Sequence, residues 1–197
     1  MEQTSNYKKY KSKNILKRIM IRLFKKKISS LLSEYSSNTT LLDVGCGEGF
    51  IADYIYKNTN IKKITGIDIN NNSIQIARNQ NNNIVYETLD INDITLENKK
   101  YDLVMCLEVL EHLKNPEHVL KKICSLANKR IIISIPNEPF FSIGNLLSFK
   151  NIRSFGTPKE HINIWTRRSF KKCLLNIGIK KFRIKSLFVW IIVIIDV

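Results

Sequence analysis

The chain has 197 residues, of which 44% are hydrophobic and 25% charged, and this balance is typical of a single globular domain with a sizeable core. Its four cysteines are scattered and form no CxxC pair, which argues against a disulfide framework and against a paired-cysteine zinc site. The polar, basic start lacks the apolar stretch of a secretory signal, and the longest apolar run, 187–195, is too short to cross a bilayer as a helix. These features predict a cytoplasmic protein.

The formal net charge is +15 at pH 7, and two interpretations of it stay open. Such an excess attracts nucleic acid, anionic lipid or an acidic substrate. The chain is also rich in Asn, Lys and Ile throughout, including the Asn-rich run 79–83, which indicates a general drift in composition. In that case much of the lysine excess is a solvated surface without a specific partner.

The first predicted element is an amphipathic helix at 14–32, where apolar residues recur at offsets of three and four. Its other face is basic and carries Lys17, Arg18, Arg22, Lys25, Lys26 and Lys27. We separate residues 1–39 as an N-terminal segment with two possible roles. It either covers a ligand site as a lid, which we favour, or lies on an anionic membrane surface.

From residue 40 onward, segments with the character of strands and helices alternate. Strands are expected at 40–44, 63–67, 84–89, 101–106, 130–135, 181–186 and 188–195, and helices at 50–57, 71–79, 116–126 and 166–176. This order predicts one α/β domain over 40–197, with a doubly wound, Rossmann-like sheet of seven strands. The sheet is expected to be mostly parallel with an antiparallel last strand, and ligands bind such sheets at the carboxyl ends of the strands.

The strongest local signal is the run Asp43-Val44-Gly45-Cys46-Gly47-Glu48-Gly49, which follows the first strand and opens a helix. Glycine lets the backbone turn sharply and approach a ligand where a Cβ would clash. The spacing is GxGxG, and the third glycine of the dinucleotide-binding pattern is replaced by Phe50. Glycines alone also suit an ordinary tight turn.

Two further acids follow the second and third strands. Asp68 ends the second strand, 19 residues after Gly49, where doubly wound folds place an acid that accepts hydrogen bonds from a ribose diol. Asp90 follows the third strand, where it either binds an adenine amino group, with Ile91 packed on the ring, or caps the next turn.

Together these three signals resemble the class I S-adenosylmethionine (SAM)-dependent methyltransferases, over roughly residue 41 to the end of the chain. The resemblance implies SAM as cofactor. It also implies a cofactor site built from Asp43, Gly45, Cys46, Gly47, Gly49, Asp68, Ile69, Asp90, Ile91 and Leu107.

The run Glu108-Val109-Leu110-Glu111-His112 is similar to a segment of two methyltransferase groups, the ubiquinone-biosynthesis O-methyltransferases and the small-RNA 3′-end methyltransferases. Spacings of three and four residues would place Glu108, Glu111 and His112 on one face of a helical turn. The resemblance implies a divalent ion, Mg²⁺, Mn²⁺ or Zn²⁺, held by these residues with His161 as a fourth ligand. The alternative is that Glu108, His112 and His161 act without metal, by hydrogen bonding or as a general base.

The segment 136–165 has little periodicity, and a loop of this length inside a domain is usually functional. It is expected on the substrate side, with Phe140, Phe141, Phe149 and Phe155 as an apolar lid or a tether. The leading hypothesis is O-methylation of a small-molecule acceptor. The alternatives are methylation of an RNA 3′ end and a regulatory protein that binds SAM without turnover, with membrane contact through the N-terminal helix as a further possibility.

Overall fold

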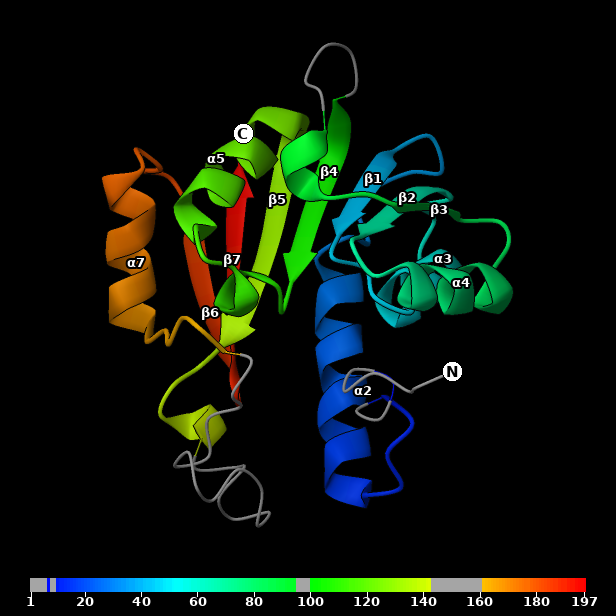
Figure 1. Ribbon diagram of the computed structural model, residues 1–197, viewed down its shortest axis with the longest axis horizontal. Coiled ribbons are helices and arrows are strands. Elements are labelled where there is room, and N and C mark those ends of the chain that lie inside the picture. The colour runs from blue at the N-terminus through cyan, green and yellow to red at the C-terminus, as the bar shows by residue number, and fades with distance from the viewer. Residues whose placement is uncertain (1–6, 8–9, 95–99, 143–160) are drawn as a thin grey trace.

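Figure 1 shows a computed structural model of the chain, which describes residues 7, 10–94, 100–142 and 161–197. The helices are α2 (Ile15–Ser30), α3 (Phe50–Asn58), α4 (Asn71–Gln80), α5 (Pro116–Leu126) and α7 (Arg167–Asn176), with short 3₁₀ turns η1 (Ile91–Asp93) and η2 (Leu110–His112). The strands are β1 (Thr40–Val44), β2 (Lys63–Asp68), β3 (Val85–Thr88), β4 (Tyr101–Leu107), β5 (Ala127–Pro136), β6 (Arg183–Leu187) and β7 (Trp190–Asp196).

The strands form one seven-stranded sheet in the order β3-β2-β1-β4-β5-β7-β6. Strands β1 to β5 are parallel, and β7 pairs antiparallel with both β5 and β6, which confirms the predicted fold class. Strand order reverses between β1 and β4, where Val44 lies beside Cys106. The carboxyl ends of these two strands are therefore the expected ligand site of the fold.

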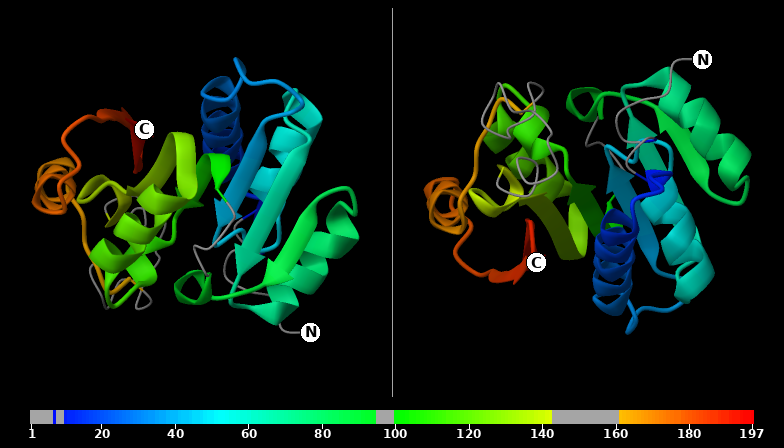
Figure 2. Two further views of the ribbon diagram at one scale, coloured as in Figure 1. Left: turned by 90° about the horizontal axis from the view of Figure 1, so that it is seen from above. Right: turned by 90° about the horizontal axis from the view of Figure 1, so that it is seen from below.

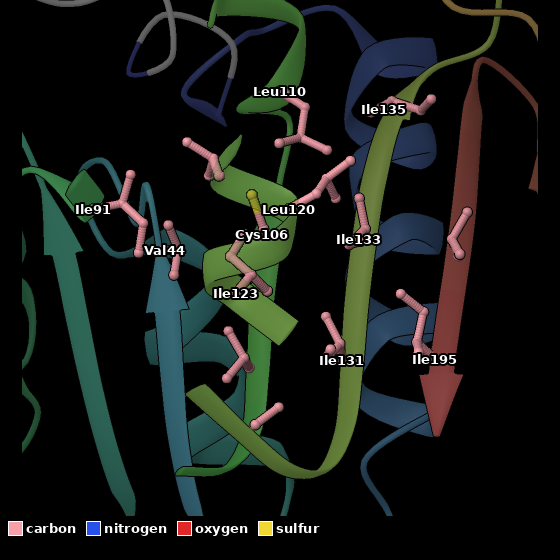
Figure 3. Packing of buried hydrophobic residues seen from close by; sticks show 14 of the residues in the cluster. Val44, Ile91, Cys106, Leu110, Leu120, Ile123, Ile131, Ile133, Ile135 and Ile195 are labelled. Atoms are coloured by element: carbon pink, nitrogen blue, oxygen red, sulfur yellow. The ribbon is translucent and has the colours of Figure 1, made fainter. Parts of the chain in front are cut away.

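Both faces of the sheet are buried because successive side chains of a strand point to opposite sides. One core contains Leu42, Val104 and Ile131 with apolar residues of α5 and α7, and Figure 3 shows part of it. The other core contains Leu41 and Leu103 with residues of α2, α3 and α4. The views along the sheet in Figure 2 separate α5 and α7 from α2 and α3.

Helix α2 is one of the layers that cover the sheet. Asn14 caps its start by accepting a hydrogen bond from the Lys17 N–H at 3.0 Å. Phe24 and Ile28 are buried, and the Phe24 ring lies 4.7 Å from Trp190 of β7. The C-terminal half of the helix therefore belongs to the core, while the N-terminal half extends beyond the sheet, toward the lower part of Figure 1.

Most strand boundaries lie within one residue of the prediction, and three strands begin two or three residues away from it. Strand β5 begins at Ala127 instead of residue 130, β6 at Arg183 instead of residue 181, and β7 at Trp190 instead of residue 188. Phe188 has a φ of 50°, so it lies in the turn between β6 and β7 and outside the ladder. An unbroken apolar run does not mark such a turn in the sequence, because both turn and strand residues are apolar. Within the described ranges, no helix is both long and apolar enough to span a bilayer.

The two faces of α2 predict different responses to truncation. Ile28→Ala is expected to lower the free energy of unfolding by about 2–5 kcal/mol, because a fully buried side chain is lost. Ile19→Ala on the same helix is expected to change it by less than about 0.5 kcal/mol, because Ile19 is 49% exposed. Urea unfolding measures both, and equal effects would contradict the packing of α2.

Candidate active site

The glycine-rich loop turns directly from β1 into α3. Gly45, Gly47 and Gly49 all have positive φ angles, 70°, 54° and 74°, a region that other residues rarely adopt. The Gly45 and Cys46 N–H groups donate to the carbonyl oxygen of Ile67 at 2.8 and 3.0 Å, which ties the loop to β2. A Cβ on Gly45 would lie 2.3 Å from a methyl of Val109. The predicted turn is confirmed, and it contacts the Glu108–His112 segment directly.

Asp68 links the end of β2 to this loop. Its Oδ2 accepts a hydrogen bond from the Gly47 N–H at 2.8 Å, and its Oδ1 accepts one from the Asn70 N–H at the same distance. Asp43 is buried on β1. Burial, reinforced by the nearby Asp68 carboxylate, raises the pKa of Asp43 to about 7. Two acidic side chains thus lie close together on β1 and at the end of β2, an arrangement that favours a cationic ligand.

The remaining residues expected at the cofactor occupy the ends of β2, β3 and β4. Ile69 is 71% exposed just after β2, and Leu107 is half-buried at the end of β4. Asp90 caps η1, since its Oδ1 accepts hydrogen bonds from the Asn92 N–H and side-chain amide at 2.8 and 2.9 Å. Ile91 packs into the core on the α5 side. Contact of Asp90 and Ile91 with adenine stays a prediction.

Glu111, His112 and His161 form a compact cluster beyond β4. One ligand atom of each residue lies within 4.8 Å of the others. The two imidazole rings meet edge to face with centroids 5.0 Å apart, and Phe141 stacks on His161 at 5.4 Å. Glu111 is buried, while His112 is exposed. The pairing of His161 with the Glu111–His112 segment, 50 residues away, agrees with the sequence prediction.

The prediction that Glu108 shares one helical face with Glu111 and His112 is wrong. It has a φ of 59° and precedes η2, so it does not share a helical face with Glu111 and His112. Its Oε1 instead accepts a hydrogen bond from the Ser134 hydroxyl of β5 at 3.3 Å. The cluster of possible metal ligands within the described chain contains Glu111, His112 and His161 but not Glu108. The left-handed backbone at Glu108 breaks the regular spacing on which the prediction depended.

Backbone contacts fix His161 against η2. The Ile162 and Asn163 N–H groups donate to the Glu111 carbonyl oxygen at 2.8 and 3.0 Å. The Asn163 side-chain amide donates to the carbonyl oxygens of Leu110 and Leu113 at 3.1 and 2.6 Å. Asn163 is thus a positioning residue that the sequence analysis missed. The sequence signal that could have pointed to Asn163 is its position two residues after His161.

The predicted insert 136–165 is only partly described. Phe140 is 60% exposed, while Phe141 is half-buried against His161. Phe149 and Phe155 lie outside the described residues. Of the two described phenylalanines, only Phe141 covers part of the site, because its ring stacks on the His161 imidazole.

Tyr10 is a second residue that the sequence analysis missed. Its ring stacks on Phe50, the first residue of α3, with centroids 4.8 Å apart and planes 15° apart. Burial raises the pKa of the Tyr10 hydroxyl, and the carboxylates of Glu108, Asp43 and Glu48 raise it further. Tyr10 therefore lies over the glycine-rich loop. The segment before α2 reaches the site, whereas α2 itself covers the sheet.

Comparisons with known proteins agree with this geometry. The profile of a family described as "Methyltransferase domain" matches residues 16–182. The chain therefore belongs to this methyltransferase domain family.

Among curated relatives, a ubiquinone biosynthesis O-methyltransferase of Coxiella burnetii is 34% identical over 90 residues, which cover 44% of this chain and 38% of that protein. The Vibrio vulnificus protein of the same name is 31% identical over 120 residues, or 58% and 46% of the two chains. The chain thus spans less than half the length of these two relatives.

Solved structures show the same fold. The plantazolicin methyltransferase BpumL, in complex with a triazolic desmethylPZN analog and SAH, superposes with a TM-score of 0.78 at 18% identity, covering 98% of this chain and 88% of that one. Magnesium protoporphyrin IX methyltransferase from Synechocystis PCC 6803, with bound SAH, gives 0.72 at 18% identity, covering 98% and 95%. Small RNA methyltransferase HEN1 gives 0.73 at 23% identity over 89% of this chain and 25% of that one. The fold is that of the class I SAM-dependent methyltransferases.

The contact between Gly45 and Val109 predicts a specific loss of ligand binding. Gly45→Ala is expected to abolish the rise in unfolding temperature on adding S-adenosylhomocysteine, because the new Cβ displaces the loop or the segment after β4. Gly178→Ala is the matched control, since Gly178 also has a positive φ, 90°, but no atom lies within 4 Å of the position that its Cβ would take. A ligand-induced shift that Gly45→Ala retains would contradict the site.

The raised pKa of Asp43 predicts a pH-dependent stability difference. A carboxyl whose pKa rises on folding contributes stability at pH values below its unfolded pKa and loses that stability as pH rises through the folded pKa. For Asp43 the loss falls between about pH 4 and pH 7. Without ligand, Asp43→Asn is therefore expected to unfold at a higher temperature than wild type at pH 8, by roughly 2–4 °C per kcal/mol relieved. If the unfolding temperatures of wild type and Asp43→Asn differed by the same amount at every pH from 4 to 8, the raised pKa of Asp43 would be contradicted.

Proposed function

We propose that the protein is an enzyme that transfers the methyl group of SAM to a hydroxyl oxygen of a small-molecule acceptor. The observation that carries this proposal is the direct contact between the glycine-rich loop and the segment that holds Glu111 and His112. A cofactor site and a group of acid–base side chains thereby share one edge of the sheet. The names of the curated relatives favour oxygen as the methylated atom.

The residues around the loop fit SAM in charge and shape. The positive-φ glycines remove side chains where the cofactor must approach the backbone. Asp68 would accept hydrogen bonds from the ribose hydroxyls, and the carboxylates of Asp68 and Asp43 would balance the positive charge of the methionine part. Tyr10, stacked on Phe50, would close this pocket from the N-terminal side.

When bound, SAM supplies a methyl group on a sulfonium, which is already a good leaving group. The protein must align the acceptor hydroxyl with that methyl and exclude water. His112 or His161 would take the hydroxyl proton as the oxygen–carbon bond forms and the sulfur–carbon bond breaks. Asn163 and Glu111 would hold these imidazoles in place through the backbone contacts between their segments.

A divalent cation is a second possible occupant of the same cluster. One carboxylate and two imidazoles within 4.8 Å of one another suit Zn²⁺ or Mn²⁺, and Mg²⁺ less well. Glu111, His112 and His161 would hold the ion, which would supply Lewis acidity to the acceptor hydroxyl. Glu108 is not part of this group in the structure, and its Oε1 accepts a hydrogen bond from Ser134 instead.

The test is methyl transfer from labelled SAM to separated lipid, RNA and small-metabolite fractions of a cell extract, with and without chelator. Label in an alkali-stable small-molecule or lipid product supports O-methylation of a small acceptor. Label in RNA 3′ ends would establish the RNA alternative, and label in none would favour a non-catalytic SAM-binding role. If the chelator leaves the methyl-transfer activity unchanged, a role for a divalent cation in the reaction is excluded.

Two histidine variants test whether methyl transfer depends on the Glu111, His112 and His161 cluster. His112→Ala is expected to lower the transfer rate by about 100-fold or more, the usual size of a lost general base or ligand. His118 lies six residues away on the exposed side of α5. His118→Ala is therefore expected to leave the rate unchanged. Equal rates for wild type and His112→Ala would contradict the proposed role of the cluster.

A further inference from the structure

Helix α2 has two opposite apolar faces, and the fold buries only one of them. Ile21, Phe24 and Ile28 pack against the sheet. On the opposite side, Ile15, Leu16, Ile19 and Leu23 are 72%, 67%, 49% and 38% exposed. At 100° per residue these four side chains fall within one sector of the helix surface, which we name the aliphatic stripe.

Cations border the aliphatic stripe. Arg18, Arg22 and Lys26 recur every four residues and are exposed. At 100° per residue, Arg18 and Arg22 lie along one edge of the stripe, Lys26 falls within its sector toward the C-terminal end, and Lys27 lies beyond the other edge. The helix contains six basic residues and no acidic one. An apolar strip beside a row of cations matches a surface that offers hydrocarbon below and negative charge above, as an anionic bilayer does.

The aliphatic stripe lies at the same end of the molecule as the candidate active site. Figure 1 shows the N-terminal half of α2 extending past the carboxyl ends of β1 and β4. The turn between β6 and β7 lies at this end too, because Trp190 pairs with Pro136 at the carboxyl end of β5. That turn presents Phe188, 61% exposed, and the segment after β5 presents Phe140, 60% exposed. Phenylalanine is among the apolar side chains that interfacial segments bury at the boundary of the acyl region.

We propose that the aliphatic stripe docks the protein on the surface of an anionic lipid bilayer, with α2 in the plane of the interface. The aliphatic side chains enter the boundary of the acyl region, and Arg18, Arg22 and Lys26 pair with lipid phosphates. Because α2 runs roughly along the strands in Figure 1, docking in this way lays the strands along the bilayer and places the carboxyl edge of the sheet beside its surface. An RNA partner would use the cations but would leave the aliphatic side chains in water, so the stripe favours lipid.

The experiment is co-sedimentation of the full chain with vesicles of phosphatidylcholine, alone or mixed with phosphatidylglycerol. We expect binding to the mixed vesicles that weakens as salt is raised, because the cations act at the surface. L16S/I19S is expected to reduce partitioning at least tenfold through lost apolar burial. R18Q/R22Q is expected to reduce it by a similar factor through lost attraction to the phosphates.

Leu175→Ser is the matched control, because Leu175 is a 45% exposed leucine on α7, a helix that carries Lys171 and Lys172. It is expected to leave vesicle binding unchanged. Equal binding to neutral vesicles, or full binding by L16S/I19S, would overturn the proposal. So would a dimer in light scattering that L16S/I19S abolishes without lipid, since a second copy would then cover the stripe. The assay needs no methyl transfer, so its failure is distinguishable from failure of the proposed function.

Discussion

The tight turn after β1 is the constraint on which the rest of the site depends. Gly45 and Cys46 give their N–H groups to Ile67, and Gly47 gives its N–H to Asp68, so the turn is fixed to β2 by backbone and side chain together. The same turn leaves no space for a Cβ between Gly45 and Val109. Strand β1, the end of β2 and the segment after β4 are therefore held in one arrangement at the switch point of the sheet.

From that turn, the site extends through a second set of contacts. The left-handed backbone of Glu108 turns the chain out of β4, and the following η2 presents Glu111 and His112. Asn163 and the backbone of Ile162 then bring His161 to them from a segment far away in the sequence. The charged groups are separated, because Asp43 and Asp68 lie by the glycine-rich loop and the two imidazoles lie together beyond β4. The site thus has two chemically distinct halves that share one wall.

Much of the fold was predictable from the sequence because its signals are local. The alternation of strands and helices, the glycine turn and the position of Asp68 all depend on short stretches of chain, and the structure has them as expected. The misses depend on contacts between distant segments. Nothing near Glu108 in the sequence indicates its positive φ, and nothing near Tyr10 indicates that it stacks on Phe50. Likewise, apolar periodicity in α2 cannot say which of two apolar faces the sheet buries.

The most direct test of the account is calorimetry of the folded protein with SAM and with S-adenosylhomocysteine. We expect saturable heat for both ligands, with affinity at least tenfold weaker in Asp68→Ala, which removes the carboxylate at the end of β2. Asp93→Ala, a change of the same kind at an exposed position in η1, is expected to bind as the wild type does. No heat with either ligand, or equal affinity for Asp68→Ala and wild type, would contradict it.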